Sequence, residues 1–232
     1  MSNNLIKTGT NYGGWYIPEQ MNLNADSIVY SGGAGEDISF DIKLQSKYGC
    51  TVILIDPTKK ALNHYNEAIA FFGATRTKFT GNIQPDYYEQ IQAETPNFNK
   101  IKFVDMGLWD KKDQLKFYKQ SNENYVSQSL IENMFGDNYD LVPVDTIGNI
   151  MAENGHNRID LLKLDIEGAE INVISKMLDD GIYPKYLLVE FDLLLKQKDP
   201  EKQTLALINR LITNEGYRIL KNDKLNITFS RV

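Results

Sequence analysis

Short runs of apolar, often β-branched residues alternate along the chain with longer segments whose apolar residues recur every three or four positions. The short runs predict buried strands, and the longer spacing predicts amphipathic helices. Their regular alternation favours a parallel sheet with helices between successive strands. The predicted strands are 27–31, 51–55, 101–106, 161–164 and 186–191.

The predicted helices carry terminal signals as well as spacing. One follows Asp56 and Pro57 and is expected to end at Gly73, one covers 168–180, and one begins at Asp199 and ends at Gly216. Segment 74–99 is interpreted as an insertion near the rim, with a helix over 85–94, and 217–232 as a β-hairpin that finishes the sheet. The residues expected to face the sheet are Leu62, Tyr65, Ile69 and Phe72 in the first helix and Ile171, Ile174 and Leu178 in the second. The apolar residues of the last helix are Leu205, Ile208, Leu211 and Ile212.

Composition is that of one globular domain. The 232 residues are 42% hydrophobic and 24% charged, and the net charge of −6 disfavours binding to nucleic acid. The single cysteine, Cys50, is expected to be buried and inert, and no apolar run approaches the roughly 20 residues that span a bilayer. We therefore expect a cytoplasmic protein with an N-terminal cap segment, 1–26, and one domain, 27–232.

A glycine-rich turn follows the first predicted strand. Gly32, Gly33, Ala34 and Gly35 precede a segment with helical spacing over 36–48, and Asp56 ends the next strand. Glycine there would let a ligand approach the backbone, and a carboxylate at the second position can accept hydrogen bonds from a ribose. A chain reversal and a helix cap are the plain alternatives. Together the two features favour a ribose-bearing cofactor.

The residues after the turn discriminate between cofactors. The dinucleotide fingerprint requires a third glycine where this chain has Ile38, and Glu36 and Asp37 lie where a pyrophosphate needs positive potential. S-adenosylmethionine has no phosphate and carries a sulfonium and an ammonium group. The charge pattern therefore favours S-adenosylmethionine over NAD.

A second motif ends the strand 161–164. Asp165 and Glu167 follow it directly, and carboxyl ends of parallel strands border the ligand crevice of open α/β sheets. We expect both carboxylates beside the cofactor, unless they only cap the following helix.

Segment 162–170, Leu-Lys-Leu-Asp-Ile-Glu-Gly-Ala-Glu, resembles the signature of the FkbM family of S-adenosylmethionine-dependent methyltransferases. Segment 32–41 with Asp56 and Pro57, and segment 106–110 leading to 115–118, extend the resemblance over about 27–191. It implies a Rossmann-like α/β fold with the seven-stranded methyltransferase sheet, order 3-2-1-4-5-7-6, helices on both faces, and the C-terminal hairpin as strands 6 and 7. It also implies methyl transfer to a hydroxyl oxygen, often of a sugar or glycan.

The resemblance implies roles for individual residues. Gly32 and Gly33 would line the methionine end of the cofactor, Asp56 would hold the ribose, and 107–109 would lie near the adenine. Many methyltransferases have an acidic residue late in strand 1 where this chain has Tyr30 and Ser31, so Glu36 or Asp37 would contact the ammonium. The residues expected to bind the cofactor are Ser31, Gly32, Gly33, Asp37, Asp56, Pro57, Gly107, Leu108, Trp109 and Asp165.

Methyl transfer to an unactivated hydroxyl needs a positioned base or a metal. Asp165 and Glu190 are expected to be catalytic, and Asp165, Glu190 and Asp192 could hold a divalent ion, Mg or Mn, although charged strand ends also act as ordinary caps. Glu167 and Glu170 are further candidates. His64 and His156 are expected to be structural or solvated.

The aromatic segment 12–18 precedes the first predicted strand of the sheet, and it could either close over the substrate or plug the sheet edge.

The expected acceptor is a hydroxyl on a small molecule or glycan. An NAD-binding oxidoreductase and a non-catalytic cofactor-binding protein are the alternatives. Nucleic-acid or amide N-methylation is disfavoured, because 165–168 replaces the Asn/Asp-Pro-Pro-aromatic motif of those enzymes. The sequence identifies neither the acceptor nor the oligomeric state.

Overall fold

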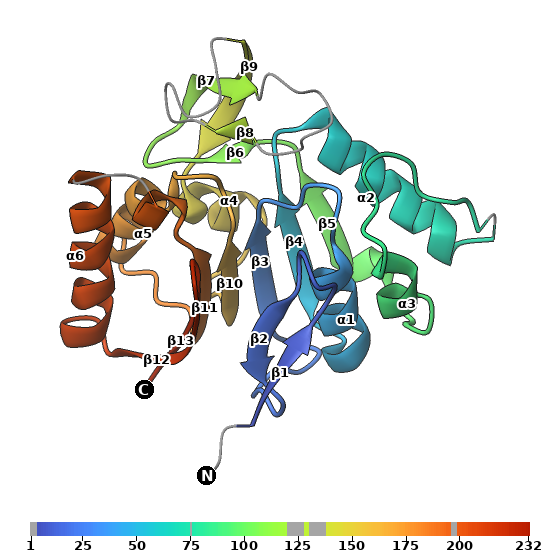
Figure 1. The fold of residues 1–232 in the computed structure, drawn as a ribbon, viewed down its shortest axis with the longest axis horizontal. Coiled ribbons are helices and arrows are strands. Elements are labelled where there is room, and N and C mark those ends of the chain that lie inside the picture. Colours follow the sequence, from blue (N-terminus) through green and yellow to red (C-terminus); the bar gives the residue numbers. More distant parts are fainter. Residues whose placement is uncertain (1–3, 75, 120–127, 130–137, 196–198) are drawn as a thin grey trace.

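A seven-stranded sheet runs through the centre of the protein (Figure 1). The computed structural model describes residues 4–74, 76–119, 128–129, 138–195 and 199–232. The sheet order is β12-β13-β11-β10-β3-β4-β5, which corresponds to 3-2-1-4-5-7-6 when the strands are numbered along the chain. This confirms the predicted fold class. The strands are β3 (Ile28–Gly32), β4 (Thr51–Ile55), β5 (Ile101–Val104), β10 (Leu161–Leu164), β11 (Tyr186–Glu190), β12 (Tyr217–Asp223) and β13 (Asn226–Arg231).

Five strands of this sheet are parallel, and the C-terminal hairpin is the exception. Strand β13 pairs antiparallel with both β11 and β12. The hairpin turns at Lys224 and Leu225, and Lys224 has a φ of +61°. The sequence predicts the turn two residues earlier, at Asn222 and Asp223. The C-terminal ends of β3, β4, β5, β10 and β11 therefore meet at one edge of the sheet.

Helices cover both faces of the sheet. Alternate residues along each strand enter one of two apolar clusters, as Val29 and Tyr30 do in β3. One cluster includes α4, α5 and α6, and the other includes α1, α2, α3 and the N-terminal strand β2. The helices are α1 (Ser39–Tyr48), α2 (Lys59–Phe72), α3 (Tyr87–Ile91), α4 (Ile147–Glu153), α5 (Glu170–Asp179) and α6 (Asp199–Thr213).

The buried face of α2 differs from the one predicted, and α6 buries only part of its apolar residues. Helix α2 buries Ala61, His64 and Ala68 and leaves Ile69 exposed. Helix α6 buries Thr204, Leu207 and Leu211, with Leu205 and Ile212 on its exposed side. In α2 the two alanines bring the helix axis close to the sheet, and larger apolar residues such as Tyr65 pack at its flank against Phe103.

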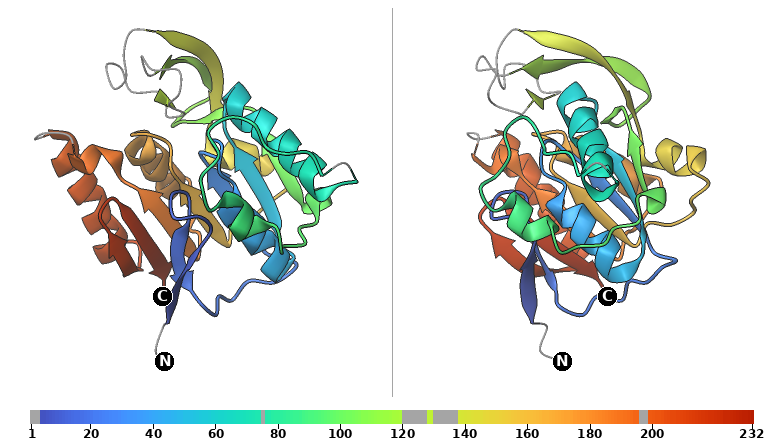
Figure 2. Two further views of the ribbon diagram at one scale, coloured as in Figure 1. Left: turned by 45° about the vertical axis from the view of Figure 1, so that its right-hand side comes forward. Right: turned by 90° about the vertical axis from the view of Figure 1, so that its right-hand side faces the viewer.

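Two smaller sheets flank the central one. Strands β1 (Leu5–Thr8) and β2 (Trp15–Pro18) form an antiparallel N-terminal hairpin. A four-stranded sheet, β6-β9-β7-β8, lies beyond the C-terminal edge of the central sheet (Figures 1 and 2). None of the helices in the described part of the chain has the length and hydropathy of a membrane-spanning segment. The strands of the small sheet are β6 (Gly107–Leu108), β7 (Asp113–Lys119), β8 (Gln128–Ser129) and β9 (Tyr139–Asp145).

Candidate active site

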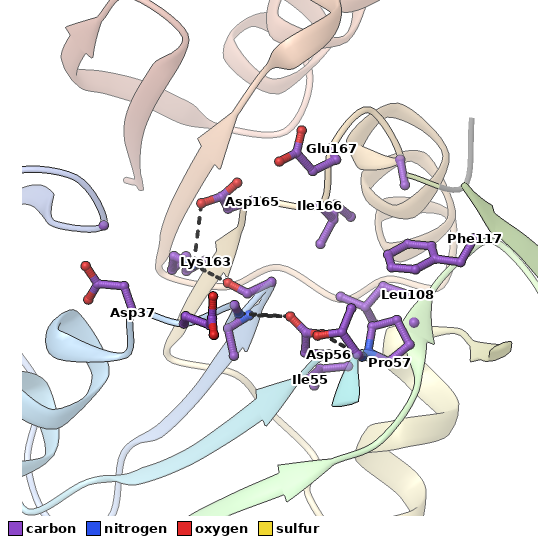
Figure 3. Close-up of a pocket in the computed structure, with 18 of the residues that line it drawn as sticks. Asp37, Ile55, Asp56, Pro57, Leu108, Phe117, Lys163, Asp165, Ile166 and Glu167 are labelled. Atoms are coloured by element: carbon purple, nitrogen blue, oxygen red, sulfur yellow. Dashed lines mark hydrogen bonds and ion pairs between the residues drawn. The ribbon is translucent and has the colours of Figure 1, made fainter. Parts of the chain in front are cut away.

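A cavity of about 380 Å³ lies at the C-terminal edge of the central sheet (Figure 3). The turn after β3, the end of β4 and the turn after β10 form its floor, and the N-terminal segment and the small sheet contribute Tyr12 and Phe117. Ligands of open α/β sheets bind at this edge, and the volume is typical of small-molecule sites. The cavity is therefore the first candidate for a cofactor site.

The glycine turn after β3 is fixed by close contact with β10. Gly33 has a φ of +79°, and a Cβ atom there would lie 1.7 Å from the main-chain oxygen of Asp165. Its N–H donates to the oxygen of Ile55 at 3.0 Å, which ties the turn to β4 as well. The sequence predicts that glycine here makes room for a ligand. At position 33, packing against the backbone of Asp165 already requires a glycine.

Asp56 holds the same turn from the end of β4. Its Oδ2 accepts hydrogen bonds from the N–H groups of Ala34 and Gly35, both at 3.0 Å, and its Oδ1 accepts two from Thr58. These bonds occupy the four positions that a carboxylate offers to donors. The side chain is 6% exposed, and burial raises its pKa against the opposing effect of the four donors. Asp56 thus shapes the backbone that lines the cavity.

A buried lysine connects the turn to the acidic end of β10. Lys163 is 4% exposed, and its Nζ donates to the oxygen of Gly33 at 2.8 Å and lies 3.9 Å from Oδ2 of Asp165 (Figure 3). None of the sequence motifs predicts a role for it. A lysine inside the buried strand Leu161–Leu164 was the signal, because a charged group in such a position needs a specific partner.

The charged residues that line the cavity are mostly carboxylates. Glu36, Asp37, Asp165 and Glu167 line it together with Asp56, whereas Lys163 is the lysine on its wall. Asp37 also caps the turn into α1, since its Oδ1 accepts from the N–H of Ser39 at 3.0 Å. The cavity is therefore suited to a ligand that carries positive charge.

The turn after β10 carries strain and a buried acid. Glu167 has a φ of +55°, a conformation that non-glycine residues rarely adopt, and Gly168 follows with +102°. Glu170 is 1% exposed, and its Oε1 accepts from the N–H groups of Ile166 and Gly168. Burial raises the pKa of Glu170 to about 8. Its contacts make it a support for the turn, not a group facing the cavity.

Glu190 and Asp192 lie at the end of the neighbouring strand, β11. Burial, followed by the charges of Asp165 and Asp192, raises the pKa of Glu190 to about 8. Burial and then the charge of Glu170 raise that of Asp192 to about 8. The charge of Asp165 acts on Glu190, but Asp165 lines the first cavity and Glu190 lines the second one described below. A carboxyl with a pKa near neutrality can exchange a proton with a bound group.

The N-terminal segment 10–18 both plugs the core and borders the cavity. Trp15 and Ile17 are 2% and 1% exposed and belong to an apolar cluster of the sheet. Thr10 donates its hydroxyl to Asp37, and its N–H donates to Oγ of Ser39, which holds the segment against the start of α1. Tyr12, beyond this anchor, is 67% exposed and lines the cavity.

A second cavity of about 300 Å³ adjoins the first, and Tyr12 lines both. It lies between the N-terminal hairpin and the C-terminal hairpin, with Glu190 on its wall. Partial desolvation, followed by the charges of Asp165, Glu167 and Glu190, raises the pKa of Tyr12, although its side chain is largely exposed. The Tyr12 hydroxyl is therefore protonated at neutral pH and can donate to a ligand.

Most residues expected to bind the cofactor line the first cavity. Ser31, Gly32 and Trp109 are not among its lining residues. Ser31 is fully buried within the sheet, Gly32 leaves room for the side chain of Leu108, and Trp109 packs against apolar clusters. The expected residues that do line it are Gly33, Asp37, Asp56, Pro57, Gly107, Leu108 and Asp165.

The expected metal site is not formed by the residues that the structure describes. No group of three or more His, Cys, Asp or Glu among them is arranged to hold a metal ion. Asp165 lines the first cavity, Glu190 lines the second, and Asp192 lines neither.

The two histidines and the cysteine lie away from both cavities. His64 is buried beside Tyr87 and its pKa is lowered to about 4 by burial, and Nδ1 of His156 lies 2.9 Å from the hydroxyl of Tyr30. Cys50 is fully buried, and burial raises its pKa to about 11, which keeps the thiol protonated.

Comparison with known proteins identifies a family. The model of the FkbM methyltransferase domain matches residues 28–219. No curated protein matches the chain. A fibrillarin pre-rRNA processing protein of Methanococcus jannaschii is 12% identical with a TM-score of 0.44, over 91% of this chain and 68% of that one. The N-terminal domain of human METTL16, in complex with SAH, is 9% identical with a TM-score of 0.41, over 89% and 62%. The strand order and the family match, not these weak likenesses, identify the fold.

Proposed function

The chain belongs to the FkbM methyltransferase family, and on this premise we propose that it is an S-adenosylmethionine-dependent O-methyltransferase. The proposed acceptor is a hydroxyl group of a sugar or glycan. The observation that carries the proposal is the acidic cavity beside the glycine turn. In this assignment residues 27–232 form the catalytic domain, and residues 1–26 form a cap over its ligand sites.

The residues of the first cavity suit this cofactor. S-adenosylmethionine supplies a methyl group on a positively charged sulfonium and also carries an ammonium group. Asp37, Asp165 and Glu167 offer negative charge to such a ligand, whereas they would repel the pyrophosphate of a dinucleotide. Phe117, Leu108 and Ile166 supply apolar walls suited to a flat base. The donor set therefore fits S-adenosylmethionine better than NAD.

Asp56 supports the ribose end of the site by an indirect route. Its carboxylate fixes the N–H groups of Ala34 and Gly35, so it determines where the backbone of the turn meets the ligand. A ribose hydroxyl would have to share a carboxylate that already accepts four hydrogen bonds. We assign Asp56 first to positioning the turn and second to contact with the ribose.

Asp165 and Glu190 divide the chemistry between them. Asp165 lies in the first cavity, beside the turn that approaches the cofactor, and its negative charge suits the sulfonium end. Glu190 lies in the second cavity, where it would take the proton of the acceptor hydroxyl. As the oxygen bonds to the methyl carbon, the bond from that carbon to the sulfonium sulfur breaks and S-adenosylhomocysteine leaves. Tyr12, between the cavities, would donate a hydrogen bond to the acceptor. None of these roles requires a metal ion.

A labelled-methyl assay tests the proposal. The protein is incubated with S-adenosylmethionine labelled in its methyl group and a panel of hydroxylated sugars, and mass spectrometry locates the label. Glu190→Gln should lower turnover by about 10² to 10⁴ while S-adenosylhomocysteine affinity changes less than about threefold, because a lost base affects the transition state. Glu201→Gln, exposed on α6, is the matched control. Label on nitrogen, or undiminished turnover in Glu190→Gln, would overturn the assignment.

A further inference from the structure

The second cavity is lined by different parts of the chain from the first. Of its lining residues that the structure describes, only Glu190 falls within the stretch 28–219 that matches the family domain. The others come from the N-terminal hairpin and from the last strands of the chain. The two terminal parts of the chain therefore form most of the wall of this cavity, beside the cofactor cavity. Its lining residues are Lys7, Asn11, Tyr12, Gly14, Trp15, Tyr16, Glu190, Lys221, Asp223, Lys224, Leu225, Asn226 and Thr228.

The walls of this cavity are held together by contacts between the two hairpins. Thr228 in β13 donates its hydroxyl to the main-chain oxygen of Tyr16 in β2 at 2.7 Å. Lys7 donates to the oxygen of Asn11 at 2.8 Å, within the N-terminal hairpin. Tyr16 is half-buried and Trp15 is buried, so both aromatic residues have fixed positions. The compartment is consequently built before any ligand binds.

Charge is distributed unevenly between the two cavities. Five carboxylates and one lysine line the first, whereas the second carries Lys7, Lys221 and Lys224 against Glu190 and Asp223. The Nζ of Lys221 lies 4.8 Å from the centre of the Tyr16 ring, and that of Lys7 lies 5.9 Å from it. An aromatic ring flanked by ammonium groups suits a molecule with both a hydrophobic ring face and negative charge.

The second cavity holds charges of both signs close together. Glu190 is paired with Asn226 of β13, which is paired in turn with Asp223 of β12, and Lys224 lies in the turn between these two strands. Lys221 lies further along β12, beside the ring of Tyr16. A negative group on the acceptor would be attracted to the lysines and repelled by Glu190. This charge pattern would hold the anionic group at the lysines and leave an uncharged, hydroxyl-bearing part of the acceptor beside Glu190.

We propose that the second cavity is the acceptor site and that the acceptor is a hydroxylated ring bearing a carboxylate or phosphate group. Its anionic group contacts Lys221 and Lys224, and the reacting hydroxyl lies beside Tyr12 and Glu190. The proposal rests on the proposed function, since it names the acceptor class for that reaction. It also gives the N-terminal segment a role as one wall of the acceptor site.

Binding measured by NMR tests this proposal without knowledge of the natural acceptor. The ¹⁵N-labelled protein, saturated with S-adenosylhomocysteine, is titrated with galacturonate, glucose 6-phosphate and methyl glucoside. At least one of the two charged probes should bind at least tenfold more tightly than the neutral one. It should shift the indole of Trp15 and the amides of 224–228. The two charged probes distinguish a carboxylate acceptor from a phosphate acceptor.

Variants locate the interaction. Lys221→Gln combined with Lys224→Gln should weaken the charged probe at least fivefold, whereas Lys202→Gln on the exposed face of α6 should leave its affinity unchanged. Equal affinity for charged and neutral probes, shifts that cluster elsewhere, or a double variant that binds like the wild type would overturn the proposal. Calorimetry with S-adenosylhomocysteine on the same sample separates failure of the proposed function from failure of the proposed acceptor site. Loss of that binding refutes the proposed function, whereas cofactor binding without probe binding refutes only the acceptor site.

Discussion

Gly33 packs directly against the backbone of Asp165. A Cβ atom at position 33 would lie only 1.7 Å from the main-chain oxygen of Asp165. The contact joins the turn after β3 to the strand end that carries the acidic motif. Two segments 130 residues apart therefore share one rigid junction, which Lys163 reinforces through its bond to the oxygen of Gly33. The spacing of the cavity walls depends on this junction.

Gly33→Ala should therefore destabilise the whole fold. The methyl group meets backbone that cannot move away, and the residue also has a positive φ, so the loss should exceed about 3 kcal/mol, the upper limit for most substitutions. Gly181→Ala is the matched control, because Gly181 has a φ of +74° with no atom within 4 Å of the added Cβ. That control should cost about 1 to 2 kcal/mol. Urea unfolding measures both, and equal losses would contradict the junction.

Asp56→Asn should lower stability and cofactor affinity together. The amide of asparagine can accept at one end only, so the N–H groups of Ala34 and Gly35 or those of Thr58 lose their partner, at a cost of about 1 to 3 kcal/mol. Thermal unfolding and calorimetry with S-adenosylhomocysteine are the two measurements. Weakened cofactor binding at full stability would assign Asp56 to the ribose alone.

Turnover should rise as pH increases through about 8. Glu190 can accept a proton only when it is ionised, and burial and the charge of Asp165 hold its pKa at about 8. Lys163→Met removes a positive charge that lowers this pKa, so the midpoint of the pH–rate profile should move upward in that variant. The midpoint in the wild type and the variant is read from initial rates at saturating acceptor. A profile that is flat between pH 6 and 9 would exclude Glu190 as the base.

Much of the fold was predictable because its signals are local. The five parallel strands and the closing hairpin have compact apolar runs, and the glycine turn and acidic motif mark the edge where the cavity forms. Strand β9 was missed because Pro143 lies inside it, and proline ordinarily argues against an internal strand. The face of α2 was misjudged because two alanines, not its larger residues, meet the sheet.

The second cavity could not be predicted from sequence. Lys7, Tyr16 and Lys221 are far apart in the chain and have no common motif. They converge because the two terminal hairpins lie side by side, an arrangement that depends on the bond between Thr228 and Tyr16 and on packing of the buried aromatic residues. The role of Lys163 could not be predicted either, since its partner Gly33 lies in the turn after a different strand, β3.

Stability should fall as pH rises from about 5 to 8. The pKa of Glu170 is raised to about 8 in the folded state, so the folded protein retains a proton that the unfolded chain releases above its ordinary value near 4.5. The stabilisation is full below the unfolded value and is lost as pH passes through the folded one. Glu170→Gln keeps an oxygen acceptor for Ile166 and Gly168, and it should make the decline in melting temperature shallower, with the remainder due to Glu190 and Asp192. Glu201→Gln should leave the decline unchanged.

Calorimetry of cofactor binding tests the central claim, that the acidic cavity beside the glycine turn is a site for S-adenosylmethionine. S-adenosylhomocysteine and NAD are titrated separately into the wild type, into Asn82→Trp, which would fill the exposed rim of the first cavity, and into Asn157→Trp, an exposed position outside it. The account predicts one S-adenosylhomocysteine per chain in the wild type and in Asn157→Trp, at least tenfold weaker binding in Asn82→Trp, and no heat with NAD. Binding of NAD without S-adenosylhomocysteine, or undiminished binding in Asn82→Trp, would contradict it.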